Sequence, residues 1–341
     1  MLTKLEKKQM KIFFTVLVIT TFIMGFTLKY AYGLKDKSLL SNLVLTQMLM
    51  PAFSVIMAQL LSEKRENIMY KFNIMFVIFT VISYIMCLVG VSQILGKRFT
   101  MINVLVIGIL LIALYVLYIK EGRDKRKSLG LTFNNMKKSW LIILLFVFLY
   151  VLNLFLSGAV YKVFNIIPTE TLSQNGISNV FIVVGIILLI PLFVINIPYF
   201  FGEEYGWRYF LQPKMQKIFG KRLGVIILGF IWGIWHIFIS IYYYSPDTFV
   251  PQIVAQIAFT VVLAVFMGYA YMKTDNLWVP IIIHYINNNF AAILTGGNLD
   301  NRVFHWNEVI IGVVMGIIVY GLFIFAKVYG KDDSKDDLLA E

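Results

Sequence analysis

The chain has 341 residues, of which 60% are hydrophobic and only 14% are charged. Soluble globular domains are about 45–50% apolar and about 25% charged, so this composition excludes a single water-soluble core and is typical of an integral membrane protein. The net charge of +12 gives no reason to expect nucleic acid as a partner, because lysines and arginines of membrane proteins gather in cytoplasmic loops beside anionic lipid headgroups.

Apolar stretches long enough to cross a bilayer recur along the whole chain. Such long continuous runs are typical of membrane helices and differ from the short alternating segments of β-barrels. The sequence predicts an all-α, polytopic transmembrane bundle with about ten spans, eight to ten being compatible with the pattern. In chain order the predicted spans are 12–28, 39–61, 73–95, 99–119, 140–161, 179–201, 224–244, 252–272, 277–294 and 308–326.

The basic residues divide unevenly between the two sides of this bundle. If the N-terminus is cytoplasmic, 23 of the 30 lysines and arginines fall on the inner side, as the positive-inside rule requires. We therefore expect both termini in the cytoplasm. We also expect a multi-pass protein of the cell membrane, a bacterial plasma membrane, in contact with anionic lipid headgroups.

A long polar interruption, KEGRDKRKSLGLTFNNMKKS at 120–139, suggests how the chain is divided. We predict N-terminal transmembrane helices (about four spans) with a basic cytoplasmic loop over 1–139 and a second transmembrane domain over 140–328. A charged tail over 329–341 is expected to be disordered. Cys87 is the only cysteine and lies in an apolar run, so neither a disulfide nor a cysteine metal site is expected.

Ionisable side chains are concentrated in three places of the second half. They are costly inside lipid and are kept mainly where they face the bundle interior and have a function. The stretch GEEYGWR (202–208) follows the sixth predicted span, His236 lies in the seventh, and HYINNN (284–289) lies in the ninth. On a helix, residues four apart share one face, which would pair Glu204 with Arg208 and place His284 beside Asn288, while Glu203 is turned by about 100°.

These residue types are suited to hydrolysis. A carboxylate and a histidine can activate a water molecule, and a second histidine and an amide can stabilise an oxyanion. Glu203, His236 and His284 could instead hold a zinc ion that carries the water. Each cluster also has a plain structural interpretation: the glutamates and arginine as a solvated membrane exit, and the histidines as hydrogen-bonded core residues. Their concentration on three neighbouring segments favours a functional site.

The three clusters match, in order, the motifs EExxxR, FxxxH and Hxxx followed by Asn or Asp. On these motifs the chain resembles the CAAX-processing and bacteriocin-processing (CPBP, Abi-type) family of intramembrane endopeptidases, over about residues 180–295. The second motif reads WGIWH, with Trp232 where the family usually has phenylalanine. The domain predicted at 140–328 would then be the catalytic one.

The resemblance implies roles for six residues: a water-activating pair, an oxyanion-stabilising pair and a pair that braces the helix end. They are, respectively, Glu203 with His236, His284 with Asn288, and Glu204 with Arg208.

We therefore expect a peptidase that hydrolyses a peptide bond in a membrane-associated peptide or protein, of CAAX or leader-peptide type, by a Glu/His-activated water. A glutamic mechanism without cofactor is preferred to a zinc-dependent one, because Asn288 is a poor zinc ligand. Zinc held by Glu203, His236 and His284 is the alternative. Two other functions fit less well: a non-catalytic immunity or scaffold member of the same fold, and a transporter, for which internal repeats would be expected.

The predicted spans raise one conflict over the water-activating pair. Glu203 falls at the cytoplasmic edge, whereas His236 lies about 18 Å along the seventh span. The two can meet if Pro191 and Pro198 kink the sixth span, if its helix continues through GEEYGWRYFLQ inside the protein, or if the seventh span begins earlier, at KIFGKRLG. We therefore predict that Glu203 is buried at membrane depth.

Overall fold

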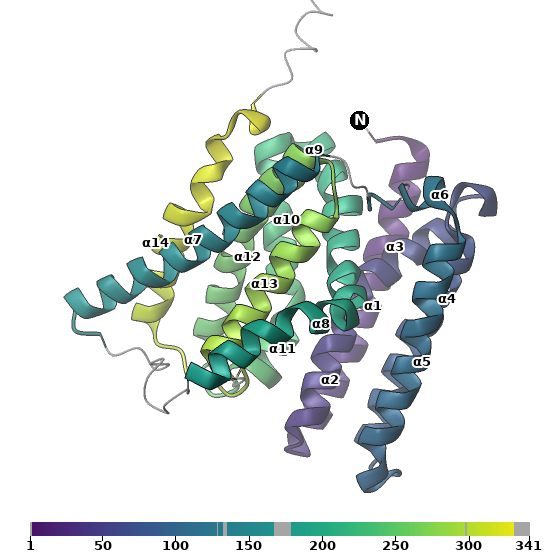
Figure 1. The fold of residues 1–341 in the computed structure, drawn as a ribbon, viewed down its shortest axis with the longest axis horizontal. Coiled ribbons are helices and arrows are strands. Elements are labelled where there is room, and N and C mark those ends of the chain that lie inside the picture. The colour runs from purple at the N-terminus through teal and green to yellow at the C-terminus, as the bar shows by residue number, and fades with distance from the viewer. Residues whose placement is uncertain (1, 128, 132–134, 167–178, 297–298, 331–341) are drawn as a thin grey trace, which may run out of the picture.

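The computed structural model describes the chain apart from residues 1, 128, 132–134, 167–178, 297–298 and 331–341, which Figure 1 draws as a thin grey trace. The described residues form helices and turns without any β-strand, which confirms the predicted all-α fold. Nearly all of the tail that was expected to be disordered lies outside the described residues.

The first part of the chain forms a group of helices drawn in purple to blue in Figure 1. They are α1 (Lys4–Gly33), α2 (Lys37–Met48), α3 (Met50–Leu60), α4 (Tyr70–Val91), α5 (Phe99–Lys120) and the short α6 (Arg123–Lys127). Single 3₁₀ turns at Arg65–Asn67 and Gly96–Arg98 join some of them. Thr3 begins α1 with a capping box, in which its hydroxyl accepts from the Glu6 N–H and the Glu6 carboxylate accepts from the Thr3 N–H.

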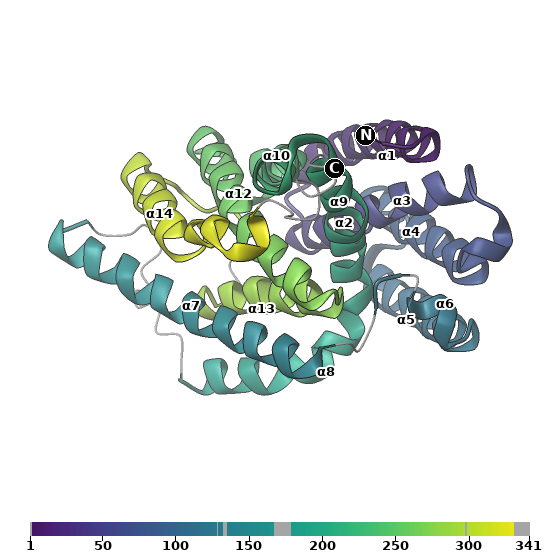
Figure 2. The same ribbon diagram turned by 90° about the horizontal axis from the view of Figure 1, so that it is seen from above.

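The second part adds α7 (Met136–Val163), α8 (Asn179–Glu204), the π-helical segment η3 (Tyr205–Leu211), α9 (Gln212–Phe219), α10 (Lys221–Trp235), α11 (Ile237–Ile239) and the π-helical η4 (Ser240–Tyr244). The chain continues with α12 (Phe249–Thr274), α13 (Trp278–Leu294) and α14 (Trp306–Val319), and the last described elements are two 3₁₀ turns, η5 (Gly321–Phe325) and η6 (Lys327–Tyr329). Figure 2 shows α13 enclosed between α7 and α12, and it contacts α8 as well.

Among the described residues, eight helices are long and apolar enough to cross a membrane, and nine if the bent pair Lys221–Trp235 and Ile237–Tyr244 is one span. The prediction of about ten spans is thus high by one or two, although it lies within the predicted range of eight to ten. Helix α13 explains one difference, because it has only 17 residues.

The helix of the sixth predicted span does not end near residue 201, and its continuation through GEEYGWRYFLQ, one of the three possibilities stated above, is confirmed. The helical run continues from α8 through η3 and α9, so that Ile182–Phe219 forms one stretch of 38 residues. Two prolines lie inside α8, and Pro198 offers no N–H to the carbonyl of Val194. The Tyr115 hydroxyl of α5 donates to that carbonyl instead, so a backbone group in the apolar layer is satisfied from a neighbouring helix.

Two glycines allow the glutamate segment to lie against the junction of α2 and α3. A Cβ on Gly202 would collide with the carbonyl of Met48, and one on Gly206 would collide with Pro51. The side of this segment that carries the two glycines is therefore in direct backbone contact with the first group of helices. This contact fixes where Glu203 and Glu204 lie.

The basic loop between α6 and α7 also packs against the second part of the chain. Leu129 and Leu131 are buried, and the Gly130 carbonyl accepts a hydrogen bond from the Leu277 N–H at 2.9 Å. The loop therefore contacts the chain directly before α13. The division into domains at residue 139 stays a prediction.

Candidate active site

Five ionisable side chains lie together inside the bundle, with little or no exposed surface: Glu203, Glu204, Arg208, His236 and His284. Glu203 is 2% exposed, which confirms that it is buried, while its depth in the membrane stays a prediction. The physical reason is the continuation of the helix, since Glu203 and Glu204 end α8 and η3 and α9 follow inside the protein. Charged groups are rarely buried so completely unless they are paired, so the partners of each one matter.

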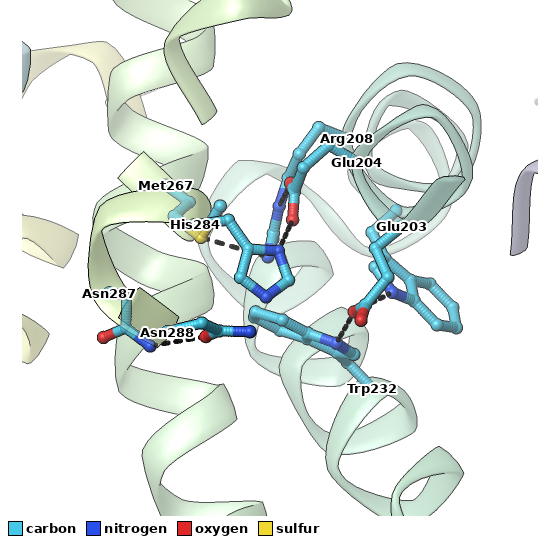
Figure 3. Close-up of polar contacts among 9 residues, drawn as sticks. Glu203, Glu204, Arg208, Trp232, Met267, His284, Asn287 and Asn288 are labelled. Atoms are coloured by element: carbon cyan, nitrogen blue, oxygen red, sulfur yellow. Dashed lines mark hydrogen bonds and ion pairs between the residues drawn. The ribbon is translucent and has the colours of Figure 1, made fainter. Parts of the chain in front are cut away.

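Glu204 binds two basic side chains, one on its own helical run and one on α13. Its Oε2 accepts from Arg208 Nε at 2.9 Å, as the spacing of four predicted, and its Oε1 pairs with His284 Nδ1 at 2.8 Å. The Arg208 guanidinium lies 4.8 Å from the centre of the Trp232 ring, and its Nη2 lies 3.6 Å from Met267 Sδ (Figure 3). The pair with His284 joins positions 80 residues apart, so no local spacing in the sequence signals it.

Glu203 is held by two tryptophans that sequence reasoning did not assign to the site. Its Oε2 accepts from Trp232 Nε1 at 2.8 Å and from Trp207 Nε1 at 3.3 Å. Among the described residues both donors address Oε2, which leaves Oε1 for another partner. Two features of the sequence could have indicated them. Trp207 lies four residues after Glu203, and Trp232 is the unusual tryptophan of the second motif.

His236 lies where α10 ends and the chain bends by 42° towards η4. Its Nδ1 is 2.8 Å from the carbonyl oxygen of Trp232. Because a carbonyl can only accept, Nδ1 carries the proton, and a neutral His236 presents the lone pair of Nε2. Within the described residues no hydrogen bond joins His236 to Glu203, but Trp232 is hydrogen-bonded to both members of the expected water-activating pair.

His284 and Asn288 project from one face of α13, as their spacing predicted (Figure 3). Asn288 is half-buried, and its Oδ1 accepts from Asn287 Nδ2 at 3.0 Å, so its NH₂ group is available to donate elsewhere. In Figure 3 the His284 nitrogen that is not bonded to Glu204 points away from it, towards the side where Asn288 and Trp232 lie.

The residues that could hold zinc do not fit a metal ion as they are arranged. Among the described residues, no three or more His, Cys, Asp or Glu side chains form a group that could hold one. Oε2 of Glu203 accepts from two indole N–H groups and Nδ1 of His284 pairs with Glu204, so the atoms that a metal could use are Oε1 of Glu203 and Nε2 of the two histidines. A mechanism without a metal stays a prediction.

Comparison with protein families finds a match to the type II CAAX prenyl endopeptidase family described as Rce1-like, at residues 177–290. No curated protein and no solved structure matches the chain. The matched range contains all three polar clusters and implies the activity of a CAAX intramembrane protease, while the apolar helices indicate a multi-pass membrane protein. Residues 177–290 therefore match the model of an Rce1-like type II CAAX prenyl endopeptidase domain, which is consistent with the CPBP family.

Proposed function

We propose that the protein is an intramembrane endopeptidase that hydrolyses a peptide bond in a membrane-associated substrate, using a water activated by Glu203 and His236. One observation carries this proposal: Glu203, Glu204, Arg208 and His284 are buried together inside a bundle of apolar helices. Burying such a group inside a membrane protein costs free energy, and a cluster of this kind is typical of a functional site.

The reaction would begin with a water between the carboxylate of Glu203 and Nε2 of His236. Glu203 takes one proton while the water oxygen bonds to the scissile carbonyl carbon, and His236 orients the water by accepting its other hydrogen. When the tetrahedral intermediate collapses, the C–N bond breaks and the proton on Glu203 passes to the leaving amine. The products are a new carboxyl terminus and a new amino terminus, and Glu203 is again ionised.

His284 and Asn288 would stabilise the negative charge that forms on the carbonyl oxygen. Glu204 holds His284 through Nδ1, so Nε2 can donate when the ring is protonated, and the Asn288 NH₂ group is available beside it. Donors fixed in advance in a site with little water are worth more to the transition state than donors that must reorganise. Glu204 and Arg208 would act as positioning residues for His284.

The substrate would be a peptide or protein whose cleavage site lies near a membrane-associated segment. The family name points to a CAAX-type protein, and a leader peptide is the second possibility. The distribution of basic residues favours a cytoplasmic position for α9 and the loop at 120–139, and with it entry of the substrate from that side.

Purified protein in detergent tests the proposal, with a prenylated CAAX peptide and an unmodified leader peptide as substrates. We expect wild type to cleave at least one of them, and Glu203→Ala and His236→Ala to abolish cleavage while each keeps the unfolding temperature of wild type. Metal analysis of the same sample, with a chelator, is expected to find activity without bound zinc. If both variants stay active, these two residues do not activate the water. If activity follows zinc content, the glutamic mechanism is wrong.

A further inference from the structure

Trp232 contacts all three polar clusters of the site. Its side chain is 2% exposed, and its indole N–H donates to Glu203 at 2.8 Å. Its backbone carbonyl accepts from His236 Nδ1, also at 2.8 Å. One face of the ring carries the Arg208 guanidinium, and the ring centre lies 5.5 Å from that of His284 in an edge-on arrangement of 75°.

We propose that Trp232 is a positioning residue that fixes Glu203 and His236 relative to each other, so that both can address one water molecule. This inference rests on the proposed function. It assigns a role to the position at which the second motif departs from its usual phenylalanine. It also explains how two residues without a hydrogen bond between them can act as a pair.

The chemistry of the indole makes this role specific. An indole N–H can only donate, so it binds the ionised carboxylate of Glu203 and does not accept from a protonated one. A hydrogen bond to a charged acceptor is stronger than one between neutral groups, and here it holds Oε2 of Glu203. The rotation of the carboxylate is thereby fixed, and Oε1 is the oxygen left for the water.

The same residue fixes His236 through its main chain. Both contacts belong to one buried residue whose ring also packs against Arg208 and His284, so a shift of Glu203 relative to His236 would disturb at least one of these contacts. Phenylalanine at this position would keep the ring packing and the carbonyl but would lose the N–H. Its loss should therefore release Glu203 and leave His236 in place.

The neighbouring tryptophans supply graded comparisons. Trp207 makes the longer bond to Glu203, at 3.3 Å, so its indole N–H should matter less. Trp235 is 4% exposed and packs edge-on against the His236 ring at 4.8 Å, but its Nε1 makes no hydrogen bond among the described residues. Trp235→Phe is thus a matched control: it removes a buried indole N–H that holds no carboxylate.

The experiment is steady-state cleavage of a peptide substrate by Trp232→Phe, Trp207→Phe and Trp235→Phe, with unfolding temperatures measured on the same samples. We expect Trp232→Phe to lower kcat by about 10- to 100-fold with KM within about twofold of wild type, since the lost bond goes to a charged group. Trp207→Phe should have a smaller effect, and Trp235→Phe should stay within about threefold of wild type.

A variant with 3-benzothienylalanine at position 232 keeps the size and shape of the indole and replaces only the N–H by sulfur. It should reproduce the loss of kcat even if Trp232→Phe lowers stability. A benzothienyl variant with the kcat of wild type would overturn the inference, and so would equal losses in Trp232→Phe and Trp235→Phe. If those results are found while Glu203→Ala is inactive, the proposed function stands without this role for Trp232. If wild type itself cleaves nothing, the proposed function fails and the inference fails with it.

Discussion

Glu204 has no exposed surface, and both of its carboxylate oxygens are used, one by Arg208 and one by His284. It therefore ties the end of α8 to α13 by ionic hydrogen bonds in an environment where water cannot replace a missing partner. Breaking a buried ion pair from one side is far more costly than its net contribution suggests, because the remaining charge stays buried.

Removing Arg208 tests this brace. We expect Arg208→Met to destabilise the protein by about 3–5 kcal/mol, seen as a large fall in unfolding temperature in detergent. Lys217→Met is the control, because Lys217 pairs with Glu6 at 2.9 Å near the surface, where an ion pair is worth about 0–1 kcal/mol. Equal losses of stability in the two variants would show that the buried ion pair stabilises the protein no more than the surface pair does.

Asn288 tests the oxyanion side of the site. We expect Asn288→Ala to lower kcat by about 10²–10³-fold, as loss of one donor to an oxyanion does elsewhere, with little change in unfolding temperature because Asn288 is only half-buried. Asn289→Ala is the matched control, since the Asn289 amide bonds to the Tyr285 carbonyl on its own helix. A control that is as impaired as Asn288→Ala would argue against a specific role in catalysis.

At the scale of the elements, the sequence predicted the regular parts of the structure and missed the irregular ones. Apolar runs revealed the helices, and a spacing of four revealed the Glu204–Arg208 pair. The π-helical segment at Tyr205–Leu211 and the bend at His236 were not predicted, because both depart from 3.6 residues per turn. The sequence offered continuation of the helix after Glu204 only as one of three possibilities, because its polar side chains also resemble a membrane exit; in the structure Arg208 and Gln212 are buried by protein.

The contacts that build the site were beyond sequence reasoning for a second reason. Trp232 and Glu203 are 29 residues apart, and His284 and Glu204 are 80 apart. The period of a helix predicts neither of these separations in the sequence. They depend on how α8, α10 and α13 pack, and a single sequence does not reveal this.

The close contact between the glutamate segment and the α2–α3 junction predicts that this segment does not tolerate a larger side chain at Gly206. We expect Gly206→Ala to destabilise the protein by about 1–3 kcal/mol and to lower cleavage, because the added methyl group meets Pro51 and displaces the segment that carries both glutamates. Gly108→Ala in α5 is the control, since a Cβ there meets nothing within 4 Å. A Gly206→Ala protein as stable and active as the control would mean that the segment adapts freely.

At the scale of the whole molecule, the family match covers only residues 177–290, yet the helices before it contact the site region directly. The Gln47 side chain donates to the Trp235 carbonyl, one residue before His236, at 3.2 Å. Gln59 donates to the Tyr205 hydroxyl, directly after Glu204, at 2.9 Å. The first group of helices therefore supports both segments that carry the proposed water-activating pair.

The predicted orientation of the bundle can be tested because the only native cysteine, Cys87, is buried. Lys4 and Lys35 are exposed and lie at the start of α1 and just after its end. In intact cells we expect a membrane-impermeant maleimide to label Lys35→Cys, and to label Lys4→Cys only after the membrane is opened. The opposite pattern would place the N-terminus outside and would contradict the positive-inside assignment.

The most direct test of the proposed chemistry is the rate at which Glu203→Gln cleaves a prenylated CAAX peptide, measured by mass spectrometry of the fragments. Glutamine keeps the size of the side chain and can still accept from the indoles of Trp207 and Trp232, but it cannot take a proton from water at neutral pH. The control is Glu66→Gln at an exposed surface position. We expect the control to cleave at the rate of wild type and Glu203→Gln to give no detectable fragment while it keeps its unfolding temperature. Cleavage by Glu203→Gln at the rate of the control would contradict the role of Glu203 as the base.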